Sequence, residues 1–289
     1  MNLIHKLKDY QQLMKLNLSL LVVFSSVVSY LIVPEGQPTI TKTLLLFLGG
    51  LLVTGAANAS NEIWEKDIDQ LMRRTMMRPL PEGRMGKMEA SIFAGLTLFS
   101  GLYILYTVFN PLSSLLALLS YLLYVLVYTP LKTRSPISTM VGAIPGALPC
   151  VIGWVSATNH LGSLAAWTLF IIQFFWQFPH FWAIAWVAHE DYKRAGMKML
   201  PRHGKVGYFT AFQCVLYSAV LIPLSILPSI AGLGSWISIT GLLIAGIWYL
   251  YNSILFLKDN SDVKARKVMF ASFIYLPVAL ISLLLDRYF

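Results

Sequence analysis

Long apolar segments recur along the whole chain and are separated by polar stretches. Each segment is close to the ~20 residues that an α-helix needs to cross a bilayer. The segments are continuously apolar and lack the period-two alternation of membrane strands, so they predict helices. We place nine of them at residues 17–33, 41–59, 90–108, 112–128, 137–156, 163–186, 207–230, 233–257 and 268–286. The pattern predicts an all-α polytopic membrane protein with about nine transmembrane helices.

The composition excludes the common soluble classes. Of the 289 residues, 57% are hydrophobic and 12% are charged, whereas a soluble domain carries about 25% charged residues. Two cysteines are too few for a disulfide scaffold, and the apolar content excludes a disordered chain. We therefore expect residues 1–289 to form a single integral membrane domain that contacts the lipid bilayer.

Basic residues lie almost entirely on one side of the predicted helices. The net charge of +9 would also fit a nucleic-acid-binding protein. In a membrane protein, however, the positions of the charged residues are more informative than their sum. We expect no nucleic-acid partner. All but two of the 22 Lys and Arg residues lie in the N-terminal segment or after an even-numbered helix; the exceptions are Lys42 and Arg287. The positive-inside rule predicts a cytoplasmic N-terminus, cytoplasmic loops and, after nine crossings, an external C-terminus.

Two long loops, 60–89 and 187–206, also contain most of the acidic residues. Each follows an even-numbered helix, and the two loops are four helices apart. This spacing predicts two related four-helix halves plus a ninth helix. The acidic residues in these loops are Glu62, Glu65, Asp67, Asp69, Glu82, Glu89, Glu190 and Asp191.

The first of these loops begins with a regular polar pattern. If the second helix continues beyond the membrane, residues four apart advance about 40° around it and about 6 Å along it. One stripe about 80° wide then contains Thr54, Asn58, Asn61, Glu65 and Asp69. Glu62 and Asp67 point away from the stripe, and we expect both to meet water. Oxygen ligands one turn apart suit Mg²⁺, although an exposed helix end would show the same spacing.

Arginines follow the acidic stripe closely. Arg73, Arg74 and Arg78 lie within ten residues of Asp69. Guanidinium groups match phosphate oxygens, and a metal with arginines would neutralise a diphosphate leaving group. The alternative is positive charge that only sets the membrane topology.

Together these motifs resemble a known family. The segment Asn61-x-x-x-Glu65-x-x-x-Asp69 with Arg74-Thr75-x-x-Arg78-Pro79-Leu80 is similar to the first aspartate-rich motif of the UbiA superfamily of intramembrane aromatic prenyltransferases. A further family segment matches Tyr128-Thr129-Pro130-Leu131-Lys132. One branch, the protoheme IX farnesyltransferases (haem O synthases), has a signature that resembles Trp176-Gln177-Phe178-Pro179-His180-Phe181 followed by Asp191-Tyr192-x-x-Ala195-Gly196-x-x-Met199-Leu200-Pro201.

Two positions depart from the superfamily pattern. Many members have aspartate where this chain has Glu65, which keeps the charge on a longer side chain. The second motif often has two carboxylates four residues apart, whereas here Asp191 is followed at that spacing by Ala195. Asp191 would therefore act without that partner, and Arg194 could contact phosphate directly.

The resemblance implies a reaction and its ligands. Farnesyl diphosphate and haem B would be the substrates, and Mg²⁺ would be the metal. The product, haem O, would serve terminal oxidase assembly or haem A synthase in the cytoplasmic (inner) cell membrane. The implied metal ligands are Asn61, Glu65, Asp69 and Asp191, and the implied diphosphate contacts are Arg74, Arg78, Lys132 and Arg194. After the diphosphate leaves, a porphyrin vinyl group would attack the allylic cation, and water would add to the product.

The sixth predicted helix has an unusual polar stripe. Gln173, Gln177 and His180 recur at helical spacing in an apolar segment that also contains Trp176. Polar side chains at membrane depth usually face the bundle interior and mark a site, and the resemblance implies that Trp176, Gln177 and His180 would contact the porphyrin. If the helix continued to Asp191, His180 would share its face about 16 Å deeper. The alternative is a set of hydrogen bonds between helices.

Two other functions remain open. A quinone-type prenyltransferase of the same superfamily would act on a small aromatic acid, and we expect it to lack the Trp-Gln-x-Pro-His-Phe segment. A secondary transporter would place its coupling carboxylates near the bilayer midplane. Here all but two of the 13 acidic residues lie on the predicted cytoplasmic side, which argues against transport.

Overall fold

The fold is entirely helical over the residues that the structure describes. This computed structural model describes residues 3–34, 36–201 and 208–289, and over these ranges it contains helices and loops but no strand. Arg202 and Lys205, two of the basic residues assigned to the cytoplasmic side, lie outside the described residues. The all-α prediction is confirmed.

Each of the nine predicted segments falls on a long helix. These helices are α2 (Leu16–Leu31), α3 (Ile40–Asp69), α4 (Lys87–Ile104), α5 (Pro111–Leu122), α7 (Ser138–Thr158), α8 (Leu164–Val187), α10 (Phe209–Leu224), α12 (Trp236–Lys258) and α13 (Asp262–Tyr288). Shorter elements are α1 (Leu3–Leu13), α6 (Thr129–Leu131), α9 (His189–Arg194), α11 (Leu227–Ile230) and the π-helical turns η1 (Leu105–Phe109) and η2 (Leu123–Tyr128).

Fewer than nine helices are both long and apolar enough to cross a membrane. Among the described residues seven meet that standard, and α1 with α2, bent by 52° at their junction, forms an eighth candidate. Helix α8 is not one of them, because its Gln, His, Trp and Pro residues lower its hydropathy. A count of nine crossings therefore stays a prediction.

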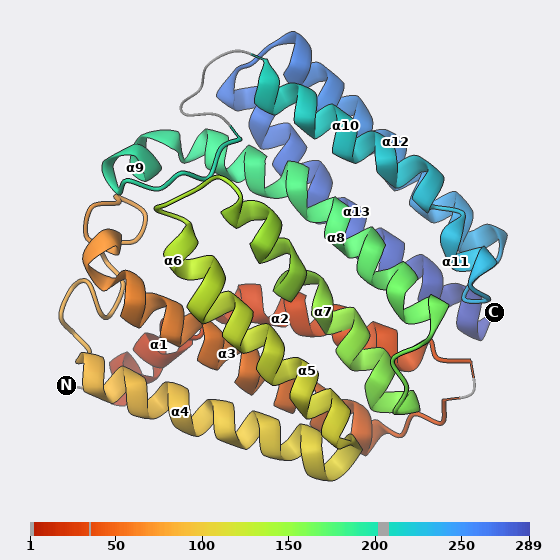
Figure 1. Cartoon of the computed structure of the whole chain (residues 1–289), viewed down its shortest axis with the longest axis horizontal. Coiled ribbons are helices and arrows are strands. Elements are labelled where there is room, and N and C mark those ends of the chain that lie inside the picture. Colours follow the sequence, from red (N-terminus) through yellow and green to blue (C-terminus); the bar gives the residue numbers. More distant parts are fainter. Residues whose placement is uncertain (1–2, 35, 202–207) are drawn as a thin grey trace.

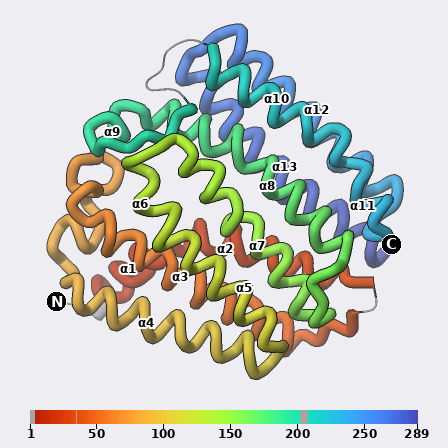
Figure 2. Tube along the Cα trace, viewed as in Figure 1, coloured from red at the N-terminus to blue at the C-terminus, as the bar shows by residue number. Residues whose placement is uncertain are grey.

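The helices lie side by side in two groups (Figure 1). Helices α2, α3, α4, α5 and α7 pack together, as do α8, α10, α12 and α13; the groups meet where α7 contacts α8 and α2 contacts α13. The predicted division set the last helix apart, but α13 packs on α8 and α12 within the second group. Figure 2 shows the turn after α3 and helix α9 at one end of the helices, near the N-terminus, and the C-terminus at the other.

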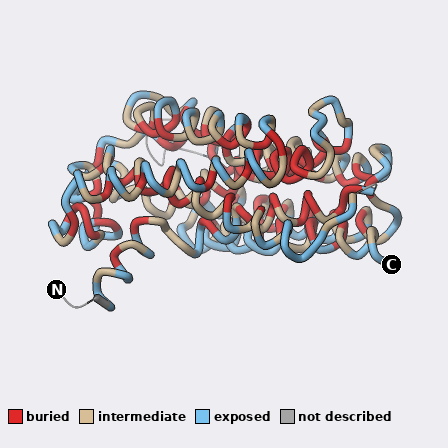
Figure 3. The backbone as a smooth tube through the Cα atoms, turned by 90° about the horizontal axis from the view of Figure 1, so that it is seen from below, coloured by how far each residue is buried: buried red, intermediate tan, exposed pale blue. Residues whose placement is uncertain are grey.

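Apolar side chains cover the outside of the bundle. Met88, Phe99, Trp236 and Ile244 are each at least 65% exposed, and exposed residues follow the outer faces of the helices (Figure 3). Such a surface would be unstable in water and is suited to lipid. Inside, small and polar residues lie beside large apolar ones; small residues are expected where helices pack closely without a hydrophobic driving force between them.

Glycines permit the closest helix contacts. A Cβ atom added at Gly153 in α7 would overlap the carbonyl oxygen of Ser26 in α2 and lie 3.0 Å from the Cβ of Ser29. Helix α7 therefore approaches α2 backbone to backbone, which holds α7 in the middle of the bundle.

We expect Gly153→Ala to lower stability by about 1–3 kcal/mol, because the added methyl group must push α2 and α7 apart. Thermal unfolding of the purified protein in detergent measures this loss. Gly95 in α4 is the matched control, because a Cβ there meets nothing within 4 Å. Equal midpoints for the two alanine variants would contradict this account of the α2–α7 contact.

Candidate active site

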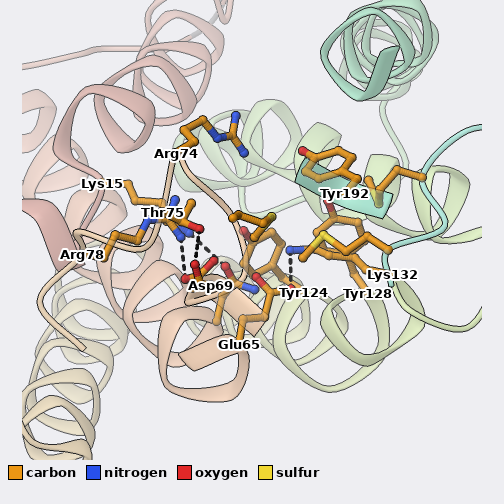
Figure 4. A pocket seen from close by; sticks show the side chains of 14 residues that line it. Lys15, Glu65, Asp69, Arg74, Thr75, Arg78, Tyr124, Tyr128, Lys132 and Tyr192 are labelled. Carbon is orange, nitrogen blue, oxygen red and sulfur yellow. Dashed lines mark hydrogen bonds and ion pairs between the residues drawn. The ribbon is translucent and has the colours of Figure 1, made fainter. Parts of the chain in front are cut away.

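A polar pocket lies where α3 leaves the bundle, and Figure 4 shows side chains from several elements pointing into it. Six residues singled out in the sequence line it: Asn61, Glu65, Asp69, Arg74, Arg78 and Lys132. They come from α3, the turn that follows α3, and the residue after α6. The structure thus assembles residues that are up to 71 positions apart, Asn61 to Lys132.

The predicted stripe exists because α3 continues as one helix through Asp69. Asn61, Glu65 and Asp69 are 1%, 4% and 1% exposed and face the pocket. Asn58 does not line the pocket; its amide donates to the Met14 carbonyl oxygen at 3.2 Å and to Ser19 Oγ at 3.0 Å. The helix ends at Asp69, where the Thr75 hydroxyl donates to the Asp69 carbonyl oxygen.

The two acids predicted to meet water differ. The Asp67 side chain is 82% exposed, as expected. The prediction for Glu62 is wrong: its side chain is 0% exposed. Glu62 does point away from the stripe on α3, but the cations of Lys15 and Arg78 lie against it on that side.

Both pocket carboxylates are paired with cations. Lys132 Nζ donates to Glu65 Oε1 at 2.9 Å, and Arg78 Nη1 donates to Asp69 Oδ2 at 2.8 Å. Burial disfavours the charge on Lys132, but the Glu65 carboxylate, together with Tyr124 and Tyr192, more than offsets this effect, so the pKa of Lys132 lies above its ordinary value. Lys132 therefore stays protonated. The pocket thus contains negatively charged carboxylates, each beside a positively charged side chain.

A π-helical turn forms one wall of the pocket. In η2 the backbone widens, a feature frequent at functional sites, and Tyr124 and Tyr128 line the cavity. Thr129 follows directly; its hydroxyl donates to the Tyr124 carbonyl oxygen and accepts from Asn61 Nδ2 at 3.1 Å. Lys132 Nζ lies 4.7 Å from the centre of the Tyr128 ring. The widened turn thus holds both the aromatic wall and the lysine against α3.

The second polar loop contacts the first. The Arg74 backbone N–H donates to Asp191 Oδ2 at 3.4 Å, and the Arg74 guanidinium lies 6.0 Å from the Tyr192 ring centre. Tyr192 lines the pocket, whereas Asp191 does not and instead pairs with Arg194. In the free protein the Asp191 carboxylate thus faces Arg194, three residues further along α9. Its metal role stays a prediction.

The pocket residues fit a hard cation such as Mg²⁺ that takes its remaining ligands from the phosphate oxygens of a substrate. No group of three His, Cys, Asp or Glu residues suited to a metal occurs among the described residues. Asn61, Glu65 and Asp69 nevertheless offer an amide oxygen and two carboxylates, and Asp69 Oδ1 is buried without a hydrogen-bond partner in the described part of the chain. Mg²⁺ typically uses one or two carboxylates and completes its shell with water and phosphate oxygens, which matches this set.

The polar residues of α8 lie elsewhere. Trp176 Nε1 donates to the Ser272 carbonyl oxygen at 2.8 Å, and His180 Nδ1 lies 2.7 Å from Ser272 Oγ. Gln177 Nε2 donates to the carbonyl oxygens of Ala143 and Gln173. These contacts between α8 and its neighbours are the alternative weighed from the sequence, and a porphyrin role stays a prediction. Helix α8 also ends at Val187, so it does not continue to Asp191.

Sequence reasoning missed several pocket residues. Lys15 lines the pocket and donates to Asn61 Oδ1 at 2.9 Å. The available signal was a single lysine directly before the first apolar segment, which we counted only as a topology charge. Tyr124 gave no signal, because aromatic residues are common at the ends of membrane helices. Tyr128 and Tyr192 lie in the segments that resemble the family, but neither was assigned a role there.

Comparisons with known proteins agree with the fold. The profile of the UbiA prenyltransferase family matches residues 22–274. A protein of Flavobacterium psychrophilum named protoheme IX farnesyltransferase is 44% identical, over 97% of this chain and 94% of that protein. A solved digeranylgeranylglyceryl phosphate synthase superposes with a TM-score of 0.77 at 24% identity, covering 98% of this chain and 99% of that one.

A UbiA homologue from Archaeoglobus fulgidus, solved with GPP and Mg²⁺, has the same fold, with a TM-score of 0.66 at 16% identity over 95% of this chain and 99% of that one. The helical fold and the family match together define an integral membrane protein. The chain belongs to the UbiA prenyltransferase family.

We expect Lys132→Gln to lower stability by on the order of 3 kcal/mol, because it leaves the buried Glu65 carboxylate without its cation. Chemical unfolding in detergent measures the loss. The double variant Lys132→Gln/Glu65→Gln removes both charges and should recover most of it. A double variant as unstable as Lys132→Gln alone would contradict the pairing.

Proposed function

We propose that this protein transfers the farnesyl group of farnesyl diphosphate to a vinyl group of haem B, with addition of water, to give haem O. The observation that carries the proposal is the pocket in which Glu65 and Asp69 face Lys132, Arg78 and Arg74. The acceptor is inferred from the 44% identical relative named protoheme IX farnesyltransferase. No feature of the pocket favours the quinone-type or transport alternatives.

Asn61, Glu65 and Asp69 would hold Mg²⁺, and Asp191 would approach from the second loop. The solved homologue that contains Mg²⁺ together with GPP supports a divalent metal for this family. When bound, the metal neutralises charge on the leaving diphosphate. The chain's own contribution is the α3 stripe, on which the side-chain oxygens of Asn61, Glu65 and Asp69 share one buried face.

The pocket cations would bind the diphosphate. Lys132, Arg78 and Arg74 line the cavity and would donate to phosphate oxygens, with Arg194 at its edge; charge-assisted bonds of this kind are among the strongest. The allylic C–O bond breaks and its electron pair leaves with the diphosphate. A porphyrin vinyl carbon then bonds to the allylic cation, water captures the resulting cation, and a proton is released. Tyr124 and Tyr128 would help to exclude water from the first cation.

The proposed setting is the cytoplasmic (inner) cell membrane. Helix α1, the turn after α3 and helix α9 lie at one end of the bundle, and the basic residues of that end favour the cytoplasmic side. Soluble farnesyl diphosphate would enter there. Haem O would pass to terminal oxidase assembly or to haem A synthase.

The loss of Asp69 should abolish most transfer. In Asp69→Asn one metal carboxylate is gone, which raises the barrier by on the order of several kcal/mol. Purified variants given farnesyl diphosphate, haem B and Mg²⁺ are assayed for farnesylated haem by mass spectrometry. Asp67→Asn, on the exposed side of α3, is the control and should keep its activity. Equal activity of Asp69→Asn and the unmodified protein would refute the site.

We also propose that Trp176, Gln177 and His180 face the porphyrin. His180→Ala should then weaken haem binding, followed by Soret absorbance, and leave farnesyl diphosphate binding nearly unchanged, because imidazole is a common ligand of haem iron. Ser272→Ala removes the hydrogen-bond partner of His180 but keeps the imidazole, so it separates the two roles. Unchanged haem affinity in His180→Ala, or equal losses in both variants, would remove His180 from the site.

A further inference from the structure

Glu62 is a buried carboxylate that the proposed reaction does not use. It follows Asn61 on α3, is 0% exposed and does not line the pocket. Neither carboxylate oxygen has a hydrogen-bond partner among the described residues. A buried charge is costly unless cations lie close by, so the position of Glu62 calls for an explanation.

Two cations lie against Glu62, and both line the pocket. Its Oε1 atom is 3.8 Å from Lys15 Nζ and 3.5 Å from Arg78 Nε. Each cation also contacts a predicted metal ligand: Lys15 donates to Asn61 Oδ1, and Arg78 donates to Asp69 Oδ2. Glu62 therefore lies behind two cations whose other side faces the cavity.

The backbone at Lys15 supports a specific role for this arrangement. Lys15 has φ 47° at the junction of α1 and α2, a left-handed conformation that is uncommon for a residue other than glycine. Other contacts hold the junction and α1 in place: Asn58 donates to the Met14 carbonyl oxygen, and Arg84 pairs with Asp9 of α1 at 2.9 Å. The chain thus maintains an unfavourable conformation that directs this amine toward α3.

We propose that Glu62 is a positioning residue that holds Lys15 and Arg78 toward the diphosphate. The inference rests on the proposed function. Two neighbouring cations repel each other, and the ammonium group of a lysine sits on a flexible four-carbon stem, so it is free to move away. A fixed carboxylate behind them offsets the repulsion and limits their motion. A guanidinium has five N–H donors, so Arg78 keeps donors for phosphate oxygens while it contacts both Glu62 and Asp69.

Calorimetric titration with inorganic diphosphate and Mg²⁺ tests this role without the haem reaction. Glu62→Gln keeps the shape of the side chain and removes its charge, and we expect affinity to fall about tenfold. Glu62→Asp keeps the charge and should retain most of the affinity. In transfer assays Glu62→Gln should raise the KM for farnesyl diphosphate and leave the KM for haem B unchanged. Asp67→Asn is the matched control and should match the unmodified protein.

A double-mutant cycle separates positioning from a general structural effect. If Glu62 acts through Lys15, the affinity lost in Glu62→Gln/Lys15→Gln is much smaller than the product of the two single losses, because contacting residues couple. If Glu62→Gln alone fails to fold, the double variant, which lacks both charges, is compared with Lys15→Gln. Diphosphate affinities of these two variants that agree within about threefold support the proposal. A larger further loss in the double variant overturns it.

The outcomes also distinguish this inference from the proposed function. Unmodified protein that binds no diphosphate would overturn both. Diphosphate binding by the unmodified protein and equally tight binding by Glu62→Gln would overturn only the role of Glu62. Independent losses in the double-mutant cycle would do the same.

Discussion

Carboxylates buried at the end of a membrane helix must be paired with cations, and this requirement connects distant parts of the chain. Glu65 and Asp69 project from the last turns of α3 and are almost fully buried. Their partners come from the residue after α6 and from the turn after α3. Because an unpaired buried charge is costly, these pairs fix α3, α6 and the 70–86 turn around one cavity.

The rest of the bundle supports that cavity. Apolar faces point outward to lipid, and close contacts such as that at Gly153 hold α7 against α2. The π-helical turn η2 then presents its tyrosines and Lys132 to α3. In the free protein, cations neutralise the pocket carboxylates. In the proposed reaction the same cations bind the diphosphate, and the carboxylates bind the metal instead. Preorganised charges of this kind need little rearrangement during the reaction.

Periodicity predicted the helices and one face of the site, because both depend on local spacing. The continuous apolar segments gave all nine long helices, and four-residue spacing gave the stripe of Asn61, Glu65 and Asp69. It failed where another element decides the environment. Glu62 is buried because Lys15 arrives from the junction of α1 and α2 and Arg78 arrives from the turn after α3. Such contacts between elements leave no regular signal in the sequence.

Farnesyl transfer to haem B in this pocket can be examined by expressing the chain in cells that lack haem O. The extracted haems are then identified by chromatography and mass. We expect a new haem whose mass equals that of haem B plus one farnesyl group and one hydroxyl group, because a proton is released when water adds. Haem B alone, in cells that contain the folded protein in their membranes, would contradict it.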